Sequence, residues 1–356
     1  MAKRIFLRMN QVTRQYCGTS KTGEDICLFT LQNAKGTVVS ILNYGATITA
    51  FKVKNADGTT NDIVLGFENQ EEYREPGYLH NYPWMGCAIG RYANRIKDAA
   101  FFLGGKKVSL SANQGSNQLH GGEHGFDKKI WELVSFGHHP HIFLELRSVS
   151  TDREEGYPGK LETSLRFELT DDNELSYCFR AVTDQPTAVN LTHHSYFNLD
   201  NGAGTILDHE LRIHGNRTLD QEDDLTANGN LSPVAETPYD FGRFTRIGER
   251  MEEAGGYDKS YVVQEKSATP ALVAELRSKI SGITLQLFST EPVVHFYSGK
   301  WIPPLHGKNG LRYGPFSGCC LETHAHPNAV NLPVFPSTIL QPGEEYFQKT
   351  IYRVLS

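Results

Sequence analysis

Two adjacent histidines, His193 and His194, lie in the stretch TAVNLTHHSYFNL, from Thr187 to Leu199. Side chains of a β-strand point to alternate faces, so a strand here divides its residues into two sets. One set is largely apolar and includes His193, and the other is entirely polar and includes His194. Such a strand packs one face on a core and lines a pocket with the other. We therefore expect His194 to carry proton-transfer chemistry and His193 to be a core histidine that hydrogen-bonds to backbone.

A glutamate stands in a second apolar stretch, GCCLETHAH, where Glu322 shares a strand face with Cys320 and His324. A buried carboxylate is costly unless something pairs with it, and desolvation raises its pKa into a range that suits a general base. If the strand instead lies at a sheet edge, Glu322 faces water and has no such role. His120 ends a polar loop, SANQGSNQLHGG, beside two glycines that let the backbone turn sharply and hold the ring over a cleft.

The histidines at positions 193, 194, 324 and 326 raise the question of a metal site, since alternate strand residues can bind one ion. A histidine site needs another well-placed ligand and supporting hydrogen bonds, and the spacing supplies neither, so we predict no metal. Asp258 follows two glycines in GGYDKSYVV, where a turn or cap residue is the simple alternative. The chain has no GxGxxG after a strand, no GxxxxGK[ST], no HExxH and no GxSxG, which disfavours nucleotide-dependent chemistry and serine hydrolysis.

The elements that must position these residues are short strands separated by Gly, Asn, Asp and Pro turns. Hairpin signals occur at Ala56-Asp57-Gly58 and at Gly104-Gly105, because glycine supplies the positive φ of tight turns. Strands are expected over the segments 25–67, Ile142–Ser148, Leu161–Leu169, Leu175–Val182 and 283–301. Short helices are expected at Gln70–Tyr78 and around Arg246–Glu253. The pattern predicts an all-β protein with stacked antiparallel sheets, folded as one domain over residues 1–356.

The composition sets further limits on partners and compartment. A net charge of −6 disfavours nucleic acid, whose binders carry basic patches. Six scattered cysteines without a CxxC pair favour a reduced compartment. The start, MAKRIFLRMNQ, has too short an apolar stretch for the core of a signal peptide. No apolar run in the sequence is long enough to span a bilayer. We expect a cytoplasmic protein without a membrane partner.

Taken together and in order, the motifs identify the chain as similar to the aldose 1-epimerases, also called galactose mutarotases. Each motif is weak alone, but the resemblance covers nearly the whole chain. The matching stretches are NYGATI at 43–48, DIVLGF at 62–67, GRYANRI at 90–96, NQLHGG at 117–122, GFDKKIWEL at 125–133, LTHHSYFNL at 191–199, GYDKSYVV at 256–263, FYSG at 296–299, CLETHAHPNAVN at 320–331 and PGEEY at 342–346.

The resemblance implies a large antiparallel β-sandwich with an open sugar cleft, a monosaccharide substrate and no cofactor. It implies that Glu322 is the general base, that His194 is the general acid, and that His120 holds the sugar near its ring oxygen. The residues implied to hydrogen-bond sugar hydroxyls are Asn94, Arg95 and Asp258. The chain departs from the family pattern at His295, where glutamine is common, and at His324 and Asn328, where Gln and Asp are usual. His295 is expected to lie near the sugar and to affect hydroxyl specificity.

Three rival functions stay open at this point. A non-catalytic carbohydrate-binding protein would not need the set of Glu322, His194 and His120. A mutarotase for phosphorylated or otherwise modified hexoses should have basic residues in the cleft, where only Arg95 has a clear place. A glycoside hydrolase needs two carboxylates flanking the scissile bond, for which Glu322 and Asp258 are the available pair. The chain is expected to be a monomer or a homodimer.

Overall fold

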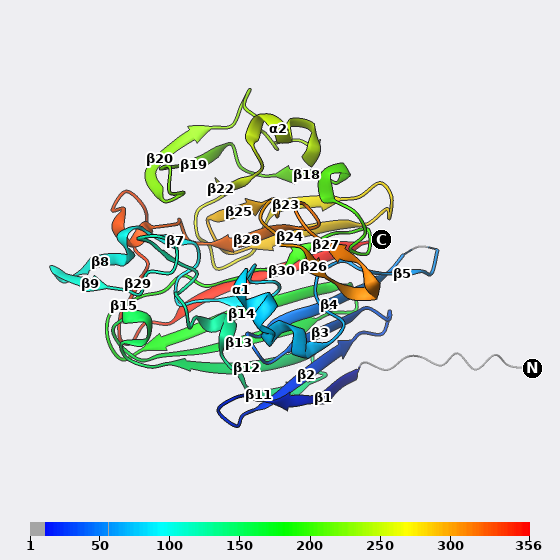
Figure 1. The fold of residues 1–356 in the computed structure, drawn as a ribbon, viewed down its shortest axis with the longest axis horizontal. Helices are drawn as coiled ribbons and strands as arrows, with labels where there is room; N and C mark the ends of the chain where they lie inside the picture. The colour runs from blue at the N-terminus through cyan, green and yellow to red at the C-terminus, as the bar shows by residue number, and fades with distance from the viewer. Residues whose placement is uncertain (1–10, 56) are drawn as a thin grey trace, which may run out of the picture.

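The strands form layers of antiparallel sheet around a shared core (Figure 1), in a computed structural model that describes residues 11–55 and 57–356. The expectation that MAKRIFLRMNQ is not a signal peptide concerns a segment that lies almost entirely outside the described residues. Ala56, in the first expected hairpin turn, also lies outside them. Within the described ranges, the largest sheet has nine strands. In spatial order they are β11 (Glu132–Gly137), β12 (Ile142–Ser150), β13 (Leu161–Leu169), β14 (Glu174–Thr183), β30 (Tyr346–Leu355), β24 (Thr284–Ser289), β23 (Ala271–Arg277), β18 (Glu210–Ile213) and β21 (Thr245–Arg246).

Two more sheets of the described chain lie against the nine-stranded one. The first has five strands in sequence order: β1 (Gln11–Thr19), β2 (Asp25–Gln32), β3 (Val38–Leu42), β4 (Thr47–Lys54) and β5 (Thr60–Asp62). The second has six strands in the order β17 (Tyr196–Phe197), β28 (Cys319–His324), β25 (Val293–Tyr297), β22 (Asp258–Val262), β19 (Arg217–Gln221) and β20 (Ala227–Pro233). The expected all-β class with stacked antiparallel sheets is confirmed.

The core lies where the apolar faces of these sheets meet. Strand β13 alternates buried and half-buried residues along its whole length, as expected when one face packs inward. The ring of Tyr352 on β30 packs edge-on against Phe197 on β17 at 5.0 Å, which joins the nine-stranded and six-stranded sheets. Trp131 is fully buried between Phe126 and Phe179, so its truncation would cost about 3–5 kcal/mol.

Two-stranded ribbons and short helices accompany these three sheets. The two-stranded ribbons pair β7 (Arg95–Ile96) with β10 (Gln118–Leu119), β8 (Ala100–Leu103) with β9 (Lys106–Ser109), β6 (Ala88–Ile89) with β16 (Thr192–His193), β15 (Thr187–Ala188) with β29 (Ile339–Leu340), and β26 (Leu305–His306) with β27 (Arg312–Tyr313). The α-helices are α1 (Pro76–His80) and α2 (Met251–Ala254). Single 3₁₀ turns cover Gln70–Arg74, Lys97–Ala99, Phe126–Lys128, Glu154–Gly156, Ile206–Asp208, Ile247–Arg250, Lys308–Gly310 and Ala329–Asn331.

Local signals in the sequence are mostly confirmed. The β4–β5 and β8–β9 hairpins form at the two glycine turns, with Gly58 at φ +85°. Both expected short helical regions are present, each as a 3₁₀ turn followed by an α-helix. The expected strand over 62–67 is wrong beyond Asp62, because the chain there leaves the sheet and keeps only an isolated bridge from Val64 to Phe197.

The stretch Thr187–Leu199 is not one strand, contrary to expectation. It breaks into β15, β16 and β17, which pair with partners in three different sheets. Of the residues on its polar face, only His194 and Tyr196 line the candidate active-site pocket. Asn190 and Thr192 instead hydrogen-bond to the backbone of residues 325 and 323, respectively, so that face fastens the segment to β28.

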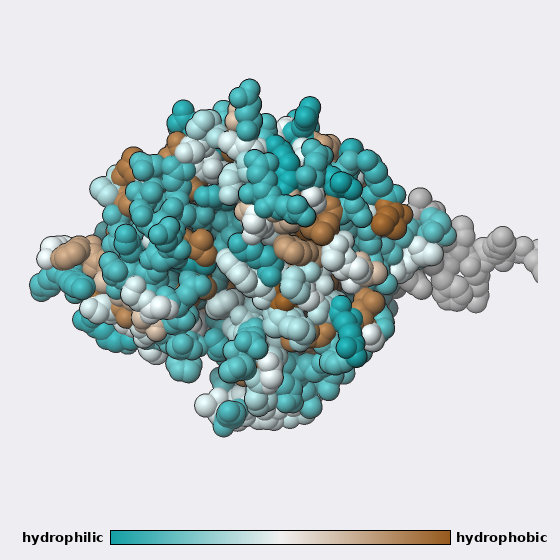
Figure 2. Space-filling view, turned by 45° about the horizontal axis from the view of Figure 1, so that its top comes forward, coloured by the Kyte–Doolittle hydropathy of each residue, from teal (hydrophilic) through white to brown (hydrophobic). Residues whose placement is uncertain are grey.

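Figure 2 shows a face that is mostly hydrophilic, with hydrophobic residues in small separate groups. In the described part of the chain, no helix has the length and apolarity needed to cross a bilayer.

Candidate active site

Neighbouring strands of the six-stranded sheet form one wall of a pocket of about 280 Å³. In their register Glu322 on β28 lies opposite His295 on β25, and His295 lies opposite Ser260 on β22. Two residues along, a second row crosses all four strands and consists of Tyr196, Cys320, Tyr297 and Asp258. Because cross-strand neighbours stand about 5 Å apart, these two rows bring polar side chains from distant parts of the chain to one surface.

All seven residues predicted from the sequence to form the site line this one pocket. They are Asn94, Arg95, His120, His194, Asp258, His295 and Glu322. The other lining residues are Tyr82, Pro83, Trp84, Asn113, Gln114, Leu119, Tyr196, Tyr297 and Trp301.

Glu322 is buried, with only 1% of its surface exposed, so the alternative of a solvent-facing edge position is wrong. Strand β28 lies between β17 and β25, and every one of its residues is buried. Burial raises the pKa of Glu322 to about 7, against the opposing charges of His295 and Arg95. One carboxylate oxygen, Oε2, has no hydrogen-bond partner in the described protein. A carboxyl group with this pKa exchanges protons readily near neutral pH.

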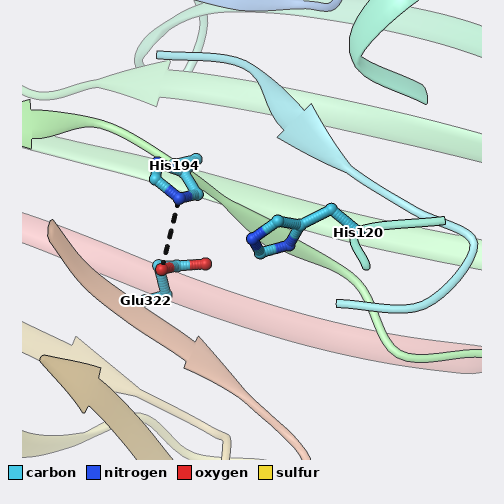
Figure 3. A group of neighbouring side chains, drawn as sticks. All are labelled: His120, His194 and Glu322. Carbon is cyan, nitrogen blue, oxygen red and sulfur yellow. Dashed lines mark ion pairs between the residues drawn. The ribbon is translucent and has the colours of Figure 1, made fainter. Parts of the chain in front are cut away.

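His194 faces Glu322 across the pocket, with Nε2 3.5 Å from Oε1 (Figure 3). Its backbone N–H donates to the carbonyl of Cys87 at 2.9 Å, which fixes the turn between β16 and β17. On the other side of the ring, Nδ1 lies 3.4 Å from Sγ of Cys320. Burial raises the pKa of the Cys320 thiol, so the thiol keeps its proton and can donate it to Nδ1. Burial also lowers the pKa of His194 to about 3.

The neighbouring His193 points the other way, into the core. Its Nε2 lies 3.2 Å from the carbonyl oxygen of Ala46, and its Nδ1 lies 3.2 Å from Oγ of Ser195. The ring packs against Tyr177 and Phe167. The predicted division between a core histidine and a pocket histidine is confirmed.

His120 reaches the pocket from a turn of unusual backbone geometry. Its φ is +54°, and the following Gly121 has φ +87°. A Cβ on Gly121 would lie 2.0 Å from the carbonyl oxygen of Gly90, so only glycine fits there. The N–H of Asn94 donates to Nδ1 of His120 at 3.3 Å, while the N–H of His120 donates to the carbonyl of Asn94 at 3.1 Å. Burial lowers the pKa of His120 well below its usual value, so the ring is neutral and carries its proton on Nε2.

This proton position bears on metal binding. Among the described residues, one nitrogen of each of His120 and His194 and one oxygen of Glu322 lie within 4.8 Å of one another, close enough to consider an ion. The His120 ring points toward the other two (Figure 3), but a nitrogen that carries a proton has no lone pair for a metal. Moving the proton to Nδ1 would set it against the N–H of Asn94. The hydrogen bonds of His120 therefore favour donation to a ligand oxygen over metal ligation.

Arg95 and Asp258 lie side by side at the other end of the wall. Nε of Arg95 donates to Oε1 of Gln114 at 2.7 Å, and a terminal nitrogen of Arg95 lies 3.8 Å from Oδ2 of Asp258. Nε2 of His295 lies 2.7 Å from Oδ1 of Asp258. Burial alone would raise the pKa of Asp258, but the hydrogen bond and charge of His295 and the charge of Arg95 lower it to about 2. Asp258 is therefore a carboxylate rather than a turn residue exposed to water.

Sequence reasoning missed the aromatic part of the pocket. Trp84 has φ +53°, packs against the rings of His120 and His194, and has an indole N–H without a partner. Trp301 is 55% exposed and stacks on Tyr297. Tyr297 and Tyr196 stand in motifs that the sequence already singled out. Trp84 lies in an irregular loop, and Trp301 lies beyond β25, because the strand expected over 283–301 already ends at Tyr297.

Comparison with known proteins shows the family to which the chain belongs. The family model described as aldose 1-epimerase matches residues 28–353. The chain is 39% identical to galactose mutarotase from Sus scrofa over 96% of this chain and 98% of that protein, and 32% identical to aldose 1-epimerase from Escherichia coli (strain K12) over 94% and 96%. A solved structure of an aldose epimerase homologue from C. elegans matches with a TM-score of 0.83 at 26% identity, covering 98% of this chain and 99% of that one. The chain therefore belongs to the aldose 1-epimerase family, isomerases that interconvert the α and β anomers of aldoses.

Proposed function

We propose that the protein equilibrates the anomers of a free aldose such as glucose or galactose, with Glu322 as general base and His194 as general acid. The observation that carries this proposal is the 3.5 Å approach of the two groups inside a buried pocket. Burial shifts the pKa of the carboxyl group upward and that of the imidazole downward. Near neutral pH the carboxyl group therefore exchanges its proton readily, whereas the imidazole is neutral until it receives a proton.

The chemistry requires two proton transfers. A cyclic aldose is a hemiacetal, so ring opening removes the proton of the C1 hydroxyl and adds one to the ring oxygen as the bond from C1 to that oxygen breaks. Glu322 takes the first proton and His194 gives the second. The open aldehyde rotates about its C1–C2 bond, and closure on the opposite face returns both protons. Each positioned acid or base contributes about 10²–10⁴-fold, so the pair supplies several powers of ten.

The two groups share one proton in the reactive state. Forms with the proton on Glu322 or on His194 belong to the same overall protonation state, which exists between the two apparent pKa values. In the empty pocket burial keeps this proton on Glu322. Transfer to His194 gives the carboxylate and imidazolium that act on the sugar.

The remaining pocket residues bind the sugar. His120 presents an N–H donor for the ring oxygen or the anomeric hydroxyl, and Trp84 and Trp301 offer aromatic faces. Asn94, Arg95 and Asp258 bind the other hydroxyls, and His295 completes the wall beside Asp258. The buried Oδ2 of Asp258 and the indole N–H of Trp84 support this assignment, because buried polar groups without internal partners gain most from ligand hydrogen bonds.

The rival functions fit the pocket less well. Arg95 is the one lysine or arginine among its described lining residues, and it is engaged by Gln114 beside the carboxylate of Asp258. A phosphorylated hexose would meet Asp258 and Glu322 without a free cation. A hydrolase would need Asp258 as its second carboxyl group, but Oδ1 of Asp258 is already bonded to His295.

We also propose a cytoplasmic monomer or homodimer that needs no cofactor. Six free cysteines, four of them buried, support a reducing compartment. Gel filtration with light scattering decides between the two oligomeric states.

Polarimetry on freshly dissolved α-D-galactose and α-D-glucose tests the proposal. The protein is expected to speed the approach to the equilibrium rotation, and the ratio of the two rates gives the preferred sugar. A rate equal to that of buffer alone with both sugars would contradict the proposed substrates and favour a binding protein or a modified sugar.

A further inference from the structure

Three buried side chains form a hydrogen-bonded line that runs from the pocket wall inward. Ser260 and His295 are a directly paired cross-strand couple on β22 and β25, and Oγ of Ser260 lies 2.8 Å from Nδ1 of His295. Nε2 of His295 lies 2.7 Å from Oδ1 of Asp258, which stands two residues before Ser260 on the same face of β22. All three side chains are more than nine-tenths buried.

The hydrogen bonds of His295 are fully used within this line. An imidazole ring has two polar atoms, and those of His295 contact Ser260 and Asp258. His295 therefore has no polar atom left for a sugar hydroxyl, although its ring lines the pocket. Asp258 has the opposite character, because Oδ2 is buried and has no hydrogen-bond partner, with Arg95 at 3.8 Å. A buried carboxylate oxygen without a partner is costly unless a ligand hydroxyl donates to it.

We propose that His295 is a positioning residue that acts through Asp258. Ser260 holds the ring, the ring holds Oδ1, and Oδ2 is thereby aimed at one hydroxyl of the sugar. This inference rests on the proposed sugar-binding role of Asp258. It replaces the expectation that His295 itself binds the sugar.

The same three residue types also occur as the triad of serine hydrolases, but the geometry here is different. Ser260 is not among the described residues that line the pocket, so its hydroxyl has no access to substrate. The hydroxyl of Ser260 contacts Nδ1 of His295, and Asp258 contacts Nε2. In a catalytic triad the two contacts are reversed, with serine at Nε2 and aspartate at Nδ1. The line therefore serves to orient the carboxylate.

Two amide variants separate the two contacts of His295. The amide nitrogen of glutamine falls near the place of Nε2, and that of asparagine falls near the place of Nδ1. His295→Gln keeps a donor for Asp258, whereas His295→Asn keeps only the contact with Ser260. We expect His295→Asn to raise KM for the sugar about tenfold with a much smaller change in kcat, and His295→Gln to restore most of the affinity.

A double-mutant cycle tests whether the effect passes through Asp258. Asp258→Asn alone should raise KM, and His295→Asn should add nothing further in the Asp258→Asn background. If the two substitutions multiply each other's effect on KM, His295 contacts the sugar itself. The same conclusion follows if His295→Gln is as defective as His295→Asn. An unchanged KM in Asp258→Asn would also overturn the inference. His326→Gln is the matched control, since His326 is a buried histidine stacked on Phe335 outside the pocket, and its KM should equal that of wild type.

A readout without turnover separates this inference from the proposed function. The carboxyl carbon of Asp258, followed by NMR during a pH titration, reports its pKa directly. Wild type should titrate well below the usual range, and His295→Asn should titrate higher, whereas His295→Gln should lie between them. Inactive wild type with these shifts would reject the proposed substrates and keep the positioning role. If wild type is active but the pKa of Asp258 is the same in His295→Asn as in wild type, the proposed substrates are kept and the positioning role is rejected.

Discussion

His194 and Glu322 lie side by side in the pocket, with Nε2 3.5 Å from Oε1, although they come from distant segments of the chain. Tyr196 pairs with Cys320 where β17 begins, whereas the backbone N–H of His194 donates to the carbonyl of Cys87 and its carbonyl accepts from Gly86. Glu322 is then paired with His295 on its other side. The acid thus lies just before the first residue of β17, beside the base on β28.

Replacing Glu322 with glutamine keeps the shape of the side chain but removes the base. We expect the enzymatic rate of mutarotation to fall by about 10²–10⁴-fold. Because burial of the charged form is unfavourable, the neutral amide should leave the midpoint of urea unfolding unchanged or raise it. Polarimetry and circular dichroism check both points. Turnover near that of wild type would remove the assignment of Glu322.

The adjacent histidines provide a matched pair of variants. His194→Asn removes the acid and should lower turnover by about 10²-fold or more, with little change in stability. His193→Asn disturbs the core contacts with Ala46 and Ser195 and should cost about 1–3 kcal/mol in unfolding free energy while the folded enzyme stays active. Activity and urea unfolding, measured on both proteins, should therefore give opposite patterns. The same pattern in both would contradict the division into pocket and core histidines.

The pH dependence of kcat/KM follows from the shared proton. Burial raises the pKa of Glu322 to about 7 and lowers that of His194 to about 3, so the pair holds one proton between these values. Above about pH 7 that proton is lost and no acid remains for the ring oxygen. We expect kcat/KM to fall about tenfold per pH unit on the alkaline side, after subtraction of the rate in buffer. A rate that keeps rising from pH 7 to pH 9 would exclude a shared-proton mechanism.

Gly121 should be intolerant of any side chain. At φ +87° an alanine is strained, and its Cβ would also collide with the backbone of Gly90, which would displace His120. Gly104→Ala is the control, because Gly104 also has a positive φ but open space around it, so it should cost only about 1–2 kcal/mol. Gly121→Ala should cost more and should also lower activity, as measured by urea unfolding and polarimetry. Equal costs with full activity in both would show that the collision is relieved elsewhere.

The sequence by itself determined the features that depend on neighbouring residues. Alternation along a strand separated His194 from His193, and the glycines at 58 and 104–105 marked the hairpins. These signals are local, because side-chain direction and turn geometry are set by residues one to four positions apart. The order of motifs along the chain was enough to indicate the family and seven of the residues that line the pocket.

Only the tertiary structure decided how these pieces pair. The break of Thr187–Leu199 into β15, β16 and β17 depends on hydrogen bonds to strands far away in the sequence, which no local pattern encodes. The burial of Glu322, and with it the raised pKa, depends on β17 and β25 covering both sides of β28. The contacts of His295 with Ser260 and Asp258 depend on the register of β22 against β25. Strand pairing is a non-local choice made by packing, and this choice turned residues of suitable type into a site with defined geometry.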